Sequence, residues 1–83
     1  MNSIEFQTKV EALRDKLGIW NIAINKKKLS QFTLGYYLDN STKTYIVYEV
    51  DERQNFRNWG EFTSEDNAVA DLYDLIKYRL WID

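Results

Sequence analysis

The amino-acid sequence predicts an α+β domain: an antiparallel three- to four-stranded meander with N- and C-terminal helices packed on one face, in the order α-β-β-β-β-α. Three observations predict this class. Apolar residues recur every three or four positions towards both ends of the chain, which is the periodicity of a helix. In the middle they alternate with polar residues, which is the periodicity of a half-buried strand. The chain contains no proline and no Gly/Ser-rich linker, so we expect one domain over residues 1–83.

The first predicted element is a helix over residues 3–17. Asn2 can cap the free amides at its start while Glu5 reaches back, the arrangement of a capping box. The apolar residues that follow share one helical face: Phe6, Val10, Leu13 and Leu17. Gly18 predicts a left-handed stop directly after the helix.

Four strands are predicted next, separated by polar turns. They cover residues 19–24, 32–39, 44–50 and 57–62. The polar stretch at residues 25–30 predicts a solvated hairpin turn that contains Lys26, Lys27 and Lys28. Dense turn signals also follow the second and third predicted strands.

A second helix is predicted at the C-terminal end. Thr63 or Ser64 can cap it, and Glu65 and Asp66 suit the positive end of its dipole. Its apolar stripe consists of Ala68, Leu72, Leu75 and Ile76, widened by Val69, Tyr73 and Leu80. The cations Lys77 and Arg79 lie near the negative end.

Strand alternation assigns side chains to the two faces of the sheet. The residues expected to face the helices are Leu34, Tyr36, Leu38, Ile46, Tyr48 and Val50. The helix-free face would then carry Tyr37, Tyr45 and Val47, joined by Trp59. Tyr and Trp are enriched at binding hot spots, so one interpretation is a partner-binding surface. The other is that these aromatic side chains pack on one another or on a loop.

Composition argues against several functional classes. The chain has no histidine and no cysteine, which removes thiolate nucleophiles and the common zinc and copper ligand sets. We therefore expect no enzymatic activity, no cofactor and no metal. A net charge of −2 argues against nucleic-acid binding. The absence of cysteine favours the cytoplasm, and no uncharged run is long enough to span a membrane.

Carboxylate catalysis is the one enzymatic alternative that the sequence leaves. Glu49, Asp51 and Glu52 lie close together, and a carboxylate pair can act as acid and base. Nothing in the sequence would desolvate one of them, so a solvated strand end is the preferred interpretation.

Two stretches resemble small bacterial immunity proteins. Residues 45–53 (YIVYEVDER) are similar to their aromatic-x-Val-Tyr…Glu-Arg-Gly strand and turn, and residues 62–68 (FTSEDNA) to their Phe-x-[Ser/Thr]-Glu-x-x-Ala helix start. The order of elements also fits the immunity protein 59 type of polymorphic toxin systems. Gln54 stands in place of that family's turn glycine, and Val69 in place of its cysteine.

The resemblance implies a cytoplasmic bacterial protein that neutralises a cognate toxin domain by direct protein–protein contact. We expect the contact to use the helix-free face and the turn after the third strand. The candidate residues are Tyr37, Tyr45, Glu49, Asp51, Glu52, Arg53, Arg57 and Trp59. The alternative is a homodimeric structural or regulatory module that buries the same face against a second copy.

Overall fold

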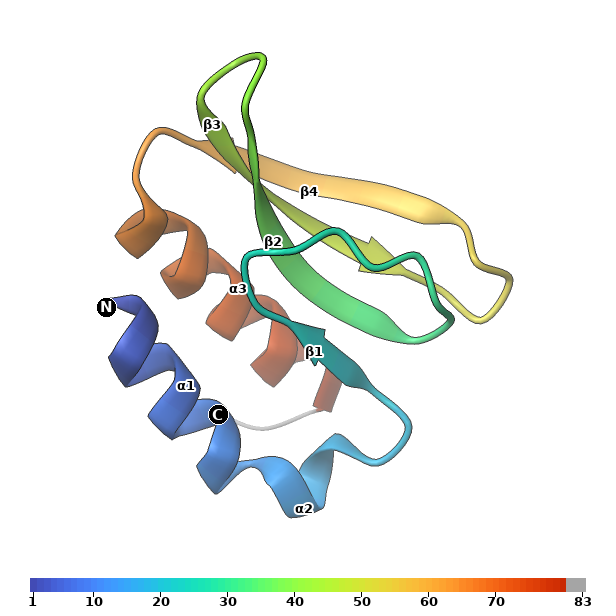
Figure 1. Cartoon of the computed structure of the whole chain (residues 1–83). Coiled ribbons are helices and arrows are strands. Elements are labelled where there is room, and N and C mark those ends of the chain that lie inside the picture. The colour runs from blue at the N-terminus through green and yellow to red at the C-terminus, as the bar shows by residue number, and fades with distance from the viewer. Residues whose placement is uncertain (81–83) are drawn as a thin grey trace.

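The computed structural model describes residues 1–80 and confirms the predicted α+β class. Its elements are α1 (Ser3–Ala12), α2 (Arg14–Leu17), β1 (Asn21–Ala23), β2 (Thr33–Asp39), β3 (Thr44–Val50), β4 (Phe56–Phe62) and α3 (Glu65–Leu80). The four strands form one sheet, and α1 and α3 pack side by side on one of its faces (Figure 1). We call this the inner face and the opposite one the outer face.

The N-terminal helix is shorter than predicted. It begins as expected, with the Asn2 side chain accepting a hydrogen bond of 2.8 Å from the Glu5 amide. The prediction of one continuous helix over residues 3–17 is wrong at Leu13. There the Leu13 amide bonds to the Val10 carbonyl, and the Lys16 amide bonds to the Leu13 carbonyl. These three-residue spacings tighten the turn and divide the segment into α1 and α2.

The sheet is mixed, so the prediction of a purely antiparallel meander is wrong at its first pair. The strand order is β1-β2-β3-β4, and β1 runs parallel to β2 while the other pairs are antiparallel. Parallel neighbours cannot be joined by a tight hairpin, because the chain must return to the same end of the sheet. Residues 24–32 make this return as a crossover, so the prediction of a hairpin turn over residues 25–30 is wrong (Figure 1).

Tyr48 holds the crossover against the outer face. Its buried hydroxyl accepts a hydrogen bond of 2.9 Å from the Lys28 amide and donates one of 2.8 Å to the Lys26 carbonyl. Burial raises the pKa of the Tyr48 hydroxyl, which keeps the proton on the donating group. Between these anchors, the Lys27 ammonium lies 5.6 Å from the Tyr37 ring centroid and 5.0 Å from that of Phe56. The Lys27 side chain therefore covers two outer-face aromatic rings.

The predicted faces are right for β2 and wrong for β3. Leu34 and Tyr36 contribute to the inner core as expected, but on β3 it is Val47 that joins them. Tyr48 and Val50 instead form an outer cluster with Ala23 and Tyr37. Ile46, which pairs with Tyr37, also belongs to the outer face, and Tyr45 belongs to the inner one. Both alternating sets of β3 are apolar, so only the register with β2 decides which set lies inside.

The inner core joins the two long helices to the central strands. Its buried residues are Phe6, Val10, Leu34, Tyr36, Val47, Ala68, Val69, Leu72, Leu75 and Ile76. The stripe predicted for α3 is thus the face that packs on the sheet. The Tyr36 hydroxyl also donates a hydrogen bond of 2.8 Å to Glu65 at the start of α3.

A Tyr48→Phe substitution should lower the free energy of unfolding by about 1–2 kcal/mol, because two backbone groups of the crossover lose their shared partner. Urea denaturation would measure the loss. Tyr78→Phe is the matched control, since its side chain is 68% exposed and water can replace its hydrogen bonds. Equal stability of the two variants would mean that the Tyr48 hydroxyl does not hold the crossover.

Candidate functional site

Trp59 is the extra residue of a β-bulge in β4. Val47 pairs with Gly60 and Tyr48 pairs with Asn58, so Trp59 has no opposite residue on β3. The bulge carries the indole towards α3, where its Nε1 donates a hydrogen bond of 3.2 Å to Glu49. The prediction that Trp59 joins the helix-free face is therefore wrong, because Tyr45, Val47 and Glu49, the residues of β3 with which it was grouped, face the helices.

Glu49 and Arg79 form an ion pair between the sheet and the last turn of α3. Glu49 is only 4% exposed, so the expected solvated strand end is wrong for this residue. Arg79 Nε lies 2.6 Å from Glu49 Oε2, and Arg79 Nη2 donates a hydrogen bond of 2.8 Å to Oε1. The guanidinium carbon also lies 5.5 Å from the Trp59 ring centroid and 5.4 Å from that of Tyr78. One arginine thus neutralises a buried carboxylate and stacks against two exposed aromatic rings.

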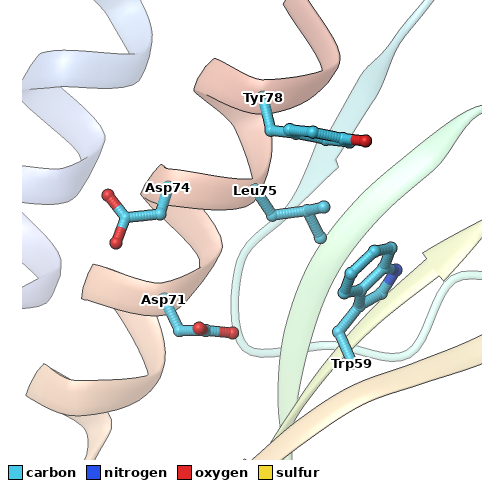
Figure 2. Close-up of a pocket in the computed structure, with 5 residues that line it drawn as sticks. All are labelled: Trp59, Asp71, Asp74, Leu75 and Tyr78. Atoms are coloured by element: carbon cyan, nitrogen blue, oxygen red, sulfur yellow. The ribbon is translucent and has the colours of Figure 1, made fainter. Parts of the chain in front are cut away.

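A groove of about 300 Å³ lies between β4 and α3. Its lining consists of Trp59, Asp71, Asp74, Leu75 and Tyr78. Figure 2 shows Tyr78 and Trp59 on either side of Leu75, with the Asp71 carboxylate directed to the Trp59 side and the Asp74 carboxylate directed away from it. Burial raises the pKa of the Asp71 carboxyl, and the nearby charge of Asp74 adds to this effect. We call this depression the aromatic groove.

A second depression of about 260 Å³ lies around Glu49 and Arg79. Its lining consists of Trp20, Phe32, Glu49, Asp51, Glu52, Arg57 and Arg79. The rings of Trp20 and Phe32 meet edge to face with centroids 5.5 Å apart. The Asp51 carboxylate accepts hydrogen bonds from the Arg53 and Asn55 amides, and these bonds hold its pKa below the usual range. Asp51 therefore shapes the turn before β4.

The structure brings together five of the eight predicted contact residues. Four line the second depression, namely Glu49, Asp51, Glu52 and Arg57, and Trp59 is bonded to one of them. Arg53 lies exposed in the adjoining turn. Tyr37 and Tyr45 do not meet, because Tyr37 packs on Tyr48 in the outer cluster and Tyr45 packs beside Tyr36 in the inner core.

Three residues of α3 were missed by the sequence reasoning: Asp71, Tyr78 and Arg79. The sequence could have indicated them, because each is three or four positions from Leu75 and so lies beside the apolar stripe on the same side of the helix. The crossover covers part of the outer face, which is the face predicted for the toxin contact and for the homodimer alternative alike.

Within residues 1–80, no group of three or more acidic, histidine or cysteine side chains could hold a metal ion. None of the helices described is both long and apolar enough to cross a membrane. Comparison of the chain with protein-family models, with curated proteins and with solved structures gives no match. The site must therefore be interpreted from its own geometry, which holds aromatic rings and charges in fixed positions and suits recognition of another molecule.

Proposed function

We propose that this chain acts by binding a partner protein, and that the partner is the toxic domain of a bacterial toxin, which the chain neutralises by direct contact. The observation that carries the proposal is the pair of exposed rings beside α3. Trp59 is 43% exposed and Tyr78 is 68% exposed, and Arg79 lies against both. Trp, Tyr and Arg are the residues most enriched at binding hot spots.

Two of these three side chains, Trp59 and Arg79, are held in place before any partner arrives. Trp59 is fixed by its hydrogen bond to Glu49, and Arg79 is fixed by its ion pair with the same carboxylate. Side chains that are already ordered lose less entropy on binding, so more of the contact energy contributes to affinity.

The identity of the partner class rests on the sequence resemblance. The two stretches that carry it, residues 45–53 and 62–68, run through β3, the end of β4 and the start of α3. These elements carry Glu49 and lead into the helix that supplies Asp71 and Tyr78. The stretches similar to immunity proteins therefore frame the surface that we assign to the contact.

Co-expression tests this function. The C-terminal domain encoded by the gene directly upstream is expressed with and without this chain, and growth and binding of the purified pair are measured. We expect the chain to restore growth, and Tyr78→Ala with Trp59→Ala to weaken binding by roughly tenfold or more.

Leu29→Ala is the matched control, because Leu29 is also an exposed apolar residue but lies in the crossover, away from α3. Far-UV circular dichroism would confirm that each variant folds. No protection by the wild-type chain would refute the toxin-neutralising role. Undiminished binding by the double variant would refute the contact surface.

A further inference from the structure

The aromatic groove combines an apolar floor, two ring walls and one directed charge. Leu75 lies between the rings of Trp59 and Tyr78, and the Asp71 carboxylate lies on the Trp59 side (Figure 2). Gly60 adds room beside this carboxylate, since a Cβ at that position would lie 3.8 Å from Asp71 Oδ2. This combination is selective for a ligand that is apolar along its stem and positive at its end.

We propose that the aromatic groove receives a lysine or arginine side chain of the partner protein, with its alkyl stem over Leu75 between Trp59 and Tyr78 and its charge beside Asp71. The inference rests on the proposed function, because it requires a protein partner. A cation over an aromatic ring is attracted to the ring's negative face, and the long stems of lysine and arginine cover apolar surface.

The charges around the groove favour a cation. Among residues 1–80, no basic side chain forms a salt bridge with Asp71, whereas Asp74 Oδ1 lies 3.7 Å from the Lys77 ammonium. The Arg79 guanidinium lies against both ring walls, and the Glu49 carboxylate, 2.6 Å from Arg79 Nε, compensates its charge. An incoming cation therefore finds one carboxylate without a basic partner and little uncompensated positive charge.

Partial burial of Asp71 also favours a positively charged occupant of the groove. Its carboxyl already has a raised pKa, which means that its charged form is short of solvent. A neutral apolar side chain in the groove would remove more water from this carboxylate and give nothing in return. An anion would be repelled. A basic side chain replaces the lost water with an opposite charge.

A titration with small probes tests the inference without the partner. Nα-acetyl-lysine amide is added to the ¹⁵N-labelled chain, and the indole NH signal of Trp59, assigned with Trp59→Phe, is followed by NMR. We expect saturable shifts of this signal and of the Asp71, Leu75 and Tyr78 amides. Nα-acetyl-norleucine amide, which has a similar stem and no charge, should produce much smaller shifts.

Two isosteric variants locate the charge. Asp71→Asn should weaken binding of the lysine probe by roughly fivefold, because it removes the carboxylate directed into the groove. Asp66→Asn, which removes an exposed carboxylate in the first turn of α3 outside the groove lining, should change the affinity by less than roughly twofold. Equal shifts from both probes, or equal affinities of the two variants, would overturn the inference.

The result is separable from that of the co-expression assay. A chain that protects cells but shows no preference for the lysine probe refutes the basic side chain and leaves the proposed function standing. A chain that binds the lysine probe as expected but gives no protection refutes the toxin-neutralising role alone.

Discussion

A Gly35→Ala substitution is expected to lower the free energy of unfolding by about 3 kcal/mol. Gly35 lies at the end of the β1–β2 pairing, where it is opposite Ala23 of β1. A Cβ on Gly35 would lie 2.7 Å from the Ala23 carbonyl oxygen, 2.8 Å from the Ala23 Cβ and 2.9 Å from the Tyr48 hydroxyl. Neither the strand backbone nor the hydroxyl that anchors the crossover can yield without breaking its own hydrogen bonds. The methyl group should therefore push β1 and the crossover away from β2.

Gly60→Ala is the matched control for this prediction. Its Cβ would lie 3.1 Å and 3.3 Å from two ring carbons of Phe62, and a single side chain can shift to relieve such contacts. We expect the free energy of unfolding to fall by less than about 1 kcal/mol. Urea denaturation of both variants would give the comparison. If the two substitutions cost the same, β1 does not pack over Gly35 as described.

An Arg79→Met substitution is expected to lower the free energy of unfolding by about 2–3 kcal/mol, because it leaves the Glu49 carboxylate buried without a counter-charge. Methionine keeps much of the apolar stem, so the loss reports the charge more than the packing. The expected cost is below that of a fully enclosed pair, since the Arg79 side chain is 28% exposed. Thermal and urea denaturation would measure it, and the Trp59 indole NH signal should shift as its neighbour is lost.

The double variant Glu49→Gln with Arg79→Met distinguishes the loss of the ion pair from the effect of leaving a buried charge without a partner. A neutral glutamine no longer needs a counter-charge, so we expect the double variant to be more stable than Arg79→Met alone by about 1 kcal/mol. Lys77→Met is the control cation, whose partner Asp74 is 76% exposed, and it should cost less than about 0.5 kcal/mol. A double variant no more stable than the single one would show that the buried charge is not the source of the loss.

Local periodicity was sufficient to predict most of the fold. The helical stripe of α3 and the alternation of β2 depend on nearest neighbours in the sequence, and both were predicted correctly. The direction of β1 was not, because it depends on a crossover whose anchor, the Tyr48 hydroxyl, lies on a strand twenty residues later. The face of β3 was missed for a related reason: Tyr45 and Val47 are as apolar as Tyr48 and Val50, so the strand alone does not choose between them.

The candidate site was predicted in part. Glu49, Asp51, Glu52 and Arg57 lie near one another because a strand end and its turn keep sequence neighbours together. Arg79 lies thirty residues from Glu49, and only the packing of α3 on the sheet brings the two together. Trp59 lies on the same face as Tyr45 and Val47, as alternation predicted, but the whole set was assigned to the wrong side of the sheet.

The bulge at Trp59 has a further effect on how the chain behaves at high concentration. β4 forms one edge of the sheet, and an edge strand of seven residues can template the addition of a strand from another molecule. An extra residue near the middle of β4 interrupts the regular spacing that such an addition needs, and the exposed charged side chains of Arg57 and Glu61 would lose water if another strand were added. Trp59, whose indole we propose contacts a partner, thus also makes β4 a poor seed for edge-to-edge polymerisation.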